Sequence, residues 1–136
     1  MKVLGVGVDI IKNSRIKRSI LSKKFINRIY SNAEIYNSKK TVNKTGYFAK
    51  RFAAKEALAK SLGIGFRKGL NFNNISIIND KYGKPKVKMN KKLKDIIYKR
   101  FNISKVDIYL SLSDEKKHSI AFVVLSKRWK LIKTLL

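Results

Sequence analysis

Three charged residues in this sequence have the types and the spacing to bind a metal ion and a phosphate group together. Asp9 follows the alternating segment GVGV, and Glu56 and Lys60 lie four residues apart in RFAAKEALAKSLG, residues 51–63. Two carboxylates from separate elements can share a hard cation such as Mg²⁺, which completes its shell with water and phosphate. A lysine beside that cation would bind further phosphate. The pattern therefore indicates phosphate chemistry, provided that the fold brings the two acids together.

A plainer interpretation exists for each of these residues. On a helix, Glu56 and Lys60 can form an ordinary surface ion pair worth about 0.3–0.5 kcal/mol. Asp9 can be a capping or loop aspartate. The helix face of Glu56 also carries Phe52 and Ala59, which is unusual for a solvated surface. We therefore expect that this outward face, which also includes Lys55, is covered.

The strand expected at residues 3–10, VLGVGVDI, has two different faces. Large aliphatic side chains form one face: Leu4, Val6, Val8 and Ile10. The other face is nearly bare and ends in a carboxylate: Val3, Gly5, Gly7 and Asp9. Glycines there allow another backbone or a ligand to come close. The GVG segment is not a dinucleotide-binding fingerprint, because Ile10 occupies the position of the third glycine.

The order of the surrounding elements predicts an α+β fold, with a mainly antiparallel sheet packed with one long helix and shorter helices. Strand patterns occur at 3–10, 74–80, 84–89, 106–113 and 119–125. Helical patterns occur at 13–20, 22–31, 33–40, 41–63 and 91–101, and Gly63 ends the longest of them. We expect a single domain, residues 1–136, with a basic amphipathic tail at about 126–136.

The composition limits the classes of protein. With 33 basic and 8 acidic residues, the formal charge is +25, which calls for a partner such as nucleic acid, a phosphorylated ligand, anionic lipid or an acidic protein. Part of this charge can also reflect a lysine-rich coding bias. The absence of cysteine excludes disulfides, thiolate metal sites and a cysteine nucleophile. No membrane span and no signal peptide are expected, so the expected location is the cytoplasm.

Four segments together resemble one family in order and spacing. They are GVGVDIIKNSRI at 5–16, RFAAKEALAKSLGIG at 51–65, NDKYGKPKV at 79–87 and YLSLSDEKKHSIAFVV at 109–124. They resemble the holo-[acyl-carrier-protein] synthases, the small bacterial 4′-phosphopantetheinyl transferases. The resemblance implies a Mg²⁺-dependent enzyme that transfers 4′-phosphopantetheine from coenzyme A to a serine of apo-acyl carrier protein. It also implies release of adenosine 3′,5′-bisphosphate and a role in fatty acid biosynthesis.

The resemblance also assigns roles to matching residues. Asp9 and Glu56 would be the Mg²⁺ ligands, and Lys60 would lie against the phosphates of coenzyme A. The nucleotide site would be lined by Arg51, Gly63, Gly65, Pro85, Ser111 and Ser113. Family members are trimers whose sites lie between subunits. Their first helix, here with Arg15 and Arg18, would dock the acidic helix of the carrier protein.

One position departs from the family pattern. Asp114 in SLSD stands where relatives commonly have histidine, so an imidazole role there is in doubt. Asp114 either replaces the histidine as an acceptor or the contact is lost. His118 is expected to be a solvated turn residue and no replacement. A trimer would also cover the glycine face of the first strand and the outward Phe52.

Two alternatives remain open at this point. The charge alone predicts a small basic nucleic-acid-binding protein, in which Asp9 and Glu56 have no role. Asp114 leaves room for a non-catalytic relative that only binds a carrier protein. For the enzyme itself, nucleic acid is not an expected partner.

Overall fold

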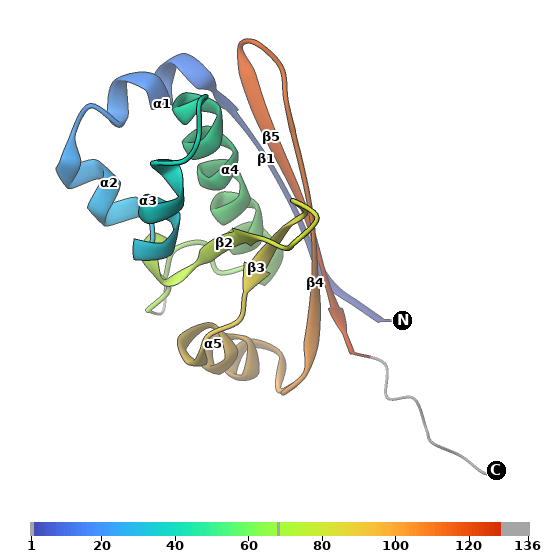
Figure 1. Cartoon of the computed structure of the whole chain (residues 1–136). Helices are drawn as coiled ribbons and strands as arrows, with labels where there is room; N and C mark the ends of the chain where they lie inside the picture. Colours follow the sequence, from blue (N-terminus) through green and yellow to red (C-terminus); the bar gives the residue numbers. More distant parts are fainter. Residues whose placement is uncertain (1, 68, 129–136) are drawn as a thin grey trace.

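A three-stranded antiparallel sheet and one long helix packed against it form the frame of the molecule (Figure 1). This computed structural model describes residues 2–67 and 69–128. The sheet has the order β1-β5-β4, with β1 at Lys2–Lys12, β4 at Val106–Asp114 and β5 at His118–Lys127. The long helix α4, Lys44–Leu62, crosses one face of the sheet. The predicted α+β fold with a mainly antiparallel sheet is confirmed.

Shorter elements surround this frame. Figure 1 shows α1, α2 and α3 on the side of α4 away from the sheet, and α5 at the opposite end of the molecule from α1. These helices are α1 Asn13–Ser19, α2 Lys23–Ile29, α3 Asn32–Ser38 and α5 Lys91–Phe101. A separate antiparallel pair follows the 3₁₀ helix η1, with η1 at Phe72–Asn74, β2 at Ser76–Asn79 and β3 at Pro85–Lys88.

Local signals in the sequence account for the helix bounds. Ser31 accepts a hydrogen bond from the backbone of Glu34, whose side chain accepts one from the backbone of Ser31. This capping box starts α3. Asn90 caps α5 by accepting from the backbone of Leu93. Gly63 ends α4 with a φ of 73°, which glycine adopts without steric cost.

The glycine face of β1 packs directly on the backbone of α4. A Cβ atom on Gly7 would overlap the carbonyl oxygen of Ala57, and one on Gly5 would overlap that of Ser61. The face is therefore covered by the chain's own long helix. The prediction that neighbouring subunits of a trimer cover this glycine face is wrong. The alternation of side chains along β1 shows that another backbone can approach the glycines, but not which backbone it is.

The long helix is buried on nearly all sides. Phe52 stacks against Phe25 and Phe72 at centroid distances of 6.5 and 5.4 Å. Ala59 is also buried. Within the last three turns of α4, only Glu56 and Lys60 remain accessible. The prediction that the helix face with Phe52 and Ala59 is covered is therefore confirmed. The prediction that a partner subunit covers Phe52 is wrong, because Phe25 of α2 and Phe72 of η1 cover it within the same chain.

A buried ion pair joins this helix to the rest of the core. The side chains of Lys55 and Glu34 are fully buried and paired with each other. The Lys55 ammonium also donates to the backbone oxygens of Ile29 and Phe72, while Glu34 accepts from the backbone of Ile77. Burial lowers the pKa of Lys55, and the charge of Glu34 opposes that shift. Lys55 therefore ties α4 to α2, α3, η1 and β2.

The opposite face of the sheet is apolar and open. Val8 pairs in register with Phe122, and Ile10 with Ile120, so their side chains lie on one face. The large side chains of this outer sheet face are 38% to 60% exposed: Val6, Val8, Ile10, Tyr109, Ile120 and Phe122. An exposed apolar surface of this kind is typical of an interaction site.

The end of the described chain differs from the sequence prediction. The tail was expected from about residue 126, yet β5 continues to Lys127 and Ser126 is buried. Arg128 then donates a 3.0 Å hydrogen bond to Asp107 of β4. The rest of the predicted tail, 129–136, lies outside the described residues. In the part of the chain that the structure describes, no helix has the length and apolarity needed to cross a membrane.

Candidate active site

The contact between β1 and α4 brings Asp9 and Glu56 together. Gly5 lies against Ser61, and Gly7 against Ala57, so the strand and helix run in opposite directions. Two strand residues span about 6.6 Å and four helical residues about 6 Å. The same step carries Asp9 level with Ala53, in the helical turn that ends at Glu56. The pKa of Glu56 is raised, first by burial and then by the charge of Asp9.

Lys60 reaches from the helix to the strand. Its ammonium donates to the carbonyl oxygen of Val8 at 2.9 Å and to Oδ1 of Asp9 at 3.2 Å. Its ion pair is therefore with Asp9 of β1 and not with Glu56, one turn earlier on its own helix. The ordinary helical surface pair considered for Glu56 and Lys60 is not what the structure shows.

Two carboxylates and two basic side chains meet at this place. Two carboxylates repel each other here, and the positive charges of Lys60 and Arg15 act against the rise in the pKa of Glu56. The ligand atoms offered are oxygens, the type that Mg²⁺ prefers. Within residues 2–67 and 69–128, no cluster of three or more acidic, histidine or cysteine side chains is found. A cation held by Asp9 and Glu56 would thus keep positions for water and phosphate.

Arg51 lies elsewhere, on the first half of α4. It lines a cavity of about 450 Å³ together with Lys40, Lys50 and Asn79. The guanidinium carbon is 3.7 Å from the centroid of the Tyr47 ring, and Nη2 donates to Asn79. The Nε atom of Arg51 is buried without a hydrogen-bond partner in the described chain. Burial lowers the pKa of this guanidinium, as expected for a buried cation whose partners are neutral.

The other predicted nucleotide-site residues are scattered. Gly63 and Gly65 follow α4, and Gly63 lines a separate cavity of about 560 Å³ with Arg67 and Arg100. Pro85 begins β3. Two serines, Ser111 and Ser113, belong to the outer sheet face, opposite Phe122 and Ile120 in the register. A single chain therefore does not bring the six predicted residues into one cavity.

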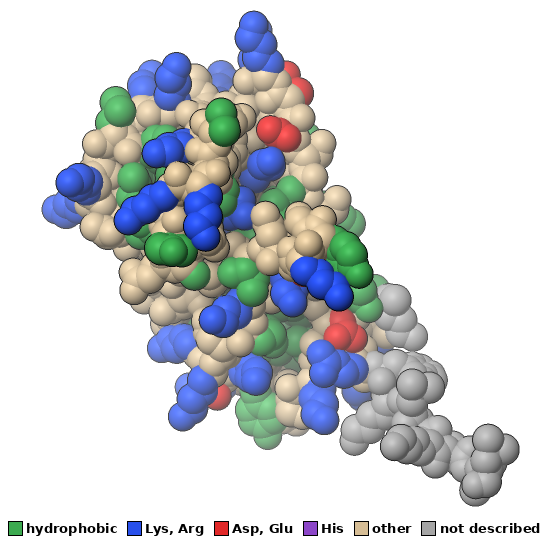
Figure 2. Space-filling model, in the orientation of Figure 1, with side chains coloured by type: hydrophobic (Ala, Val, Ile, Leu, Met, Phe, Trp, Pro, Cys, Tyr) green, Lys and Arg blue, Asp and Glu red, His purple; other side chains and the backbone are tan. Residues whose placement is uncertain are grey.

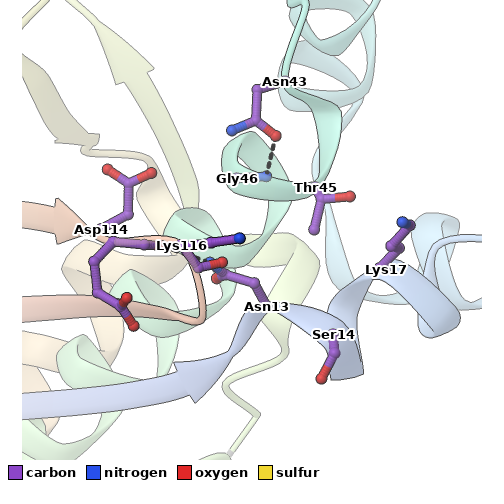
Figure 3. A pocket seen from close by; sticks show the side chains of 9 residues that line it. Asn13, Ser14, Lys17, Asn43, Thr45, Gly46, Asp114 and Lys116 are labelled. Carbon is purple, nitrogen blue, oxygen red and sulfur yellow. Dashed lines mark hydrogen bonds between the residues drawn. The ribbon is translucent and has the colours of Figure 1, made fainter.

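Asp114 lies near the entrance to α4. A cavity of about 570 Å³ lies there. Figure 3 shows Asn13 and Lys17 on one side of it, Thr45 at the start of α4, Asp114 at the end of β4 and Lys116 from the turn that follows. Oδ1 of Asp114 is 3.8 Å from the ammonium of Lys50 on α4. The aspartate that departs from the family pattern thus pairs with a lysine of the Arg51 cavity.

The β4–β5 turn is fixed to the start of α1. Asn13 donates to the carbonyl oxygens of Glu115 and Lys116, and it accepts from Ser119. His118 pairs with Glu115 at 2.8 Å at the end of this turn. The prediction that His118 is a solvated turn residue is wrong in detail, because His118 is the first residue of β5, pairs in register with Lys12 and is half-buried.

The two arginines expected to dock the carrier protein lie on α1. Arg15 and Arg18 are exposed, whereas Ile16 anchors the same helix in the core. The guanidinium of Arg15 lies 5.9 Å from the centroid of the Phe52 ring. Because Arg15 also acts on the pKa of Glu56, α1 borders the acidic pair.

Basic side chains are dispersed over the molecule. Figure 2 shows lysine and arginine side chains over many elements of one face, with few acidic side chains between them. They do not form a single continuous stripe on that face. On this face, the arrangement indicates a general attraction for acidic partners.

Comparisons with known proteins agree with one another. The model of the 4′-phosphopantetheinyl transferase superfamily matches residues 5–123. The holo-[acyl-carrier-protein] synthase of Pelagibacter ubique is 52% identical over 128 residues, covering 94% of this chain and 100% of that protein. The chain belongs to the 4′-phosphopantetheinyl transferase superfamily. Within it, the similar curated protein is a holo-[acyl-carrier-protein] synthase, and the prediction that the chain is an enzyme of this type is confirmed.

Solved structures of relatives share the fold. The crystal structure of holo-[acyl-carrier-protein] synthase from Neisseria meningitidis superposes with a TM-score of 0.80 at 37% identity, covering 92% of this chain and 99% of that one. The enzyme from Bacillus anthracis, in complex with CoA (3′,5′-ADP), superposes with a TM-score of 0.78 at 32% identity. That match covers 94% of this chain and 100% of that one. The predicted transferase-like fold is confirmed.

Two features of the site were missed by the sequence analysis. The pairing of Lys50 with Asp114 joins residues far apart in the sequence, and no periodicity reports such a contact. The preference of Lys60 for Asp9 over Glu56 was also missed. The one indication of this pairing in the sequence is that Asp9 and Glu56 were both expected to face the same cation, which puts Asp9 within reach of a lysine next to Glu56 on the helix.

Proposed function

We propose that this protein transfers the 4′-phosphopantetheine group of coenzyme A to a serine of apo-acyl carrier protein. Adenosine 3′,5′-bisphosphate leaves, and the product serves fatty acid biosynthesis. One observation carries the proposal: Asp9, Glu56 and Lys60 meet at one accessible place between β1 and α4. Membership of the superfamily and the relative solved with CoA support the reaction and the donor.

Mg²⁺ is the cation that this oxygen set fits. Asp9 and Glu56 would hold it, and it would supply positive charge that neutralises the phosphates of coenzyme A. The Lys60 ammonium already contacts Asp9, so the place accepts a positive charge. This stand-in cation supports the assignment independently of the resemblance.

The reaction needs positioning and charge neutralisation more than a protein nucleophile. The serine oxygen forms a bond to the phosphorus that carries pantetheine, and the bond from that phosphorus to the bridging oxygen breaks. Lys60 would neutralise the negative charge that builds up on the leaving nucleotide. The serine proton passes to a base in the site.

Among the predicted nucleotide-binding residues, Arg51 is the strongest candidate for a contact with a phosphate of the nucleotide. Its buried Nε atom lacks a partner in the described chain, and Lys40 and Lys50 line the same cavity. A phosphate oxygen would satisfy that atom and the buried charge together. We assign the remaining nucleotide contacts to Gly63, Gly65, Pro85, Ser111 and Ser113.

A homotrimer accounts for the separation of these residues. The outer sheet face is apolar and exposed, and Ser111 and Ser113 lie on it. A second copy packed on this face would bury apolar surface and bring the serines of one chain toward the acidic pair of its neighbour. The active site would then be formed between subunits.

The acidic carrier protein is the partner that α1 fits. Arg15 and Arg18 are exposed beside the acidic pair and point to a negatively charged helix as their ligand. A serine delivered there would lie close to Asp9 and Glu56.

Mass spectrometry of the carrier protein tests the proposal. The protein is mixed with apo-acyl carrier protein, coenzyme A and Mg²⁺, and the carrier is weighed intact. We expect the mass to increase by one phosphopantetheinyl group, and the gain to be lost when EDTA is added. An unmodified carrier over a range of carriers and conditions would refute the activity and favour a binding-only relative.

A further inference from the structure

The ammonium of Lys60 contacts the carboxylate of Asp9, one of the two acids that would hold the metal ion. It lies 3.2 Å from Oδ1 of Asp9 and 2.9 Å from the carbonyl oxygen of Val8. The Asp9 side chain is only 17% exposed, whereas that of Lys60 is 54% exposed. The carboxylate is thus held in place by its surroundings, while the lysine reaches it from solvent.

We propose that Lys60 competes with the divalent cation for Asp9, and that coenzyme A relieves this competition by drawing Lys60 onto its phosphates. The inference rests on the proposed function, and it adds that the affinity for the divalent cation depends on whether coenzyme A is bound. Metal binding is weak in the protein alone and becomes tight when coenzyme A is present. Lys60 therefore acts both as a phosphate contact and as a substitute for the metal.

The geometry makes the exchange feasible. Lysine has a flexible stem and three donors, so its ammonium can change partners without movement of the helix. A divalent cation and an ammonium repel each other, so each weakens the binding of the other to the same carboxylate. A diphosphate beside the metal gives the displaced ammonium a partner with more negative charge than Asp9. Because linkage is reciprocal, metal must then also tighten the binding of coenzyme A.

Direct measurement of Mn²⁺ binding tests this idea without an activity assay. Mn²⁺ accepts the same oxygen ligands as Mg²⁺, and its free fraction is read by electron paramagnetic resonance. Without coenzyme A, we expect Lys60→Met to bind Mn²⁺ about fivefold more tightly than wild type, the scale of a partly exposed ion pair. Lys60→Arg, which keeps the charge and the pairing, should stay near wild type.

A matched control separates the effect of the Lys60–Asp9 contact from the effect of the protein's overall positive charge. Lys94→Met removes one exposed positive charge from α5 and should leave the Mn²⁺ affinity unchanged within about twofold. Saturating coenzyme A should tighten Mn²⁺ binding more in wild type than in Lys60→Met, because only the wild type has a lysine to displace.

The outcomes distinguish this inference from the proposed function. If Asp9→Asn binds Mn²⁺ as wild type does, or if no variant binds it with or without coenzyme A, the metal assignment and the competition both fail. If Asp9→Asn abolishes binding but Lys60→Met binds Mn²⁺ no more tightly than wild type, only the competition fails. Equal tightening in Lys60→Met and Lys94→Met would also overturn it.

Discussion

At the level of single residues, Asp9 and Glu56 have different surroundings but one expected task. We predict that Asp9→Asn or Glu56→Gln lowers the rate of Mg²⁺-dependent carrier modification by about two orders of magnitude or more. The fold should remain intact, because neither side chain belongs to the core. Initial rates measured with circular dichroism on the same samples test this.

Asp95→Asn is the matched control, since Asp95 is an exposed acid on α5, away from β1. It should retain the wild-type rate. Full activity in both site variants would remove the metal assignment.

The raised pKa of Glu56 also predicts a dependence of stability on pH. Because the folded pKa lies above the unfolded one, the native state holds more protons in this window, and Glu56 lowers stability as pH rises through its folded pKa. Without divalent cations at pH 7, we expect Glu56→Gln to raise Tm by a few degrees. At a pH below the unfolded value of a glutamate, the difference should vanish.

Thermal melts at both pH values in EDTA measure this effect. A Tm that falls at pH 7 would show that Glu56 contributes more through contacts than it costs through repulsion.

At the level of elements, Gly7 sets how closely β1 approaches α4. We predict that Gly7→Ala lowers Tm by about 10 °C or more, because the added Cβ would overlap the carbonyl oxygen of Ala57 and no flexible side chain can move aside. Gly83→Ala is the comparison, since open space surrounds Gly83 and only its φ of 81° opposes a side chain. Similar losses in both variants would contradict the backbone contact.

The helix α1 carries the expected contact with the carrier protein. We predict that Arg15→Glu raises KM for the carrier about tenfold or more and changes KM for coenzyme A less, because charge reversal repels an acidic partner. Lys94→Glu on α5 controls for the change in total charge. Steady-state kinetics with each substrate varied in turn measure the two constants, and equal changes would remove the docking role.

The sequence predicted the elements well because their signals are local. Ser31 with Glu34, Asn90 and Gly63 act within a few residues of the bounds that they set. The environment of α4 was not predictable in the same way. Lys55 reaches Glu34 across the core, and only the folded chain shows that pairing.

At the level of the whole molecule, the outer sheet face gathers six partly exposed apolar side chains on one surface. We predict that Phe122→Lys, in the central strand of that face, gives a monomer and lowers activity at least tenfold, because a buried lysine opposes assembly. Light scattering after size-exclusion chromatography reports the mass. Tyr98→Lys changes an exposed aromatic residue on α5 and should leave the oligomer and the rate unchanged. A wild-type monomer would contradict the trimer.

The candidate site was predictable only in part at this scale. Asp9, Glu56 and Lys60 were identified by residue type, and the structure brings them together. Arg51, Gly63 and Ser111 were assigned to one nucleotide site, but Arg51 and Gly63 line different cavities and Ser111 lies on the outer sheet face. Sequence patterns carry no information about how copies of a chain meet, so this separation became visible only in three dimensions.

The direct contact between the glycines of β1 and the backbone of α4 has a consequence for redesign of the site. Because main-chain atoms touch there, repacking of side chains cannot widen or narrow the gap between the strand and the helix. One residue inserted into α4 between Ala53 and Glu56 would rotate the turns on either side of it by about 100° relative to each other. Attempts to change the preferred ion should therefore alter the length of an acid, for example glutamate for aspartate, and leave the spacing of the two elements untouched.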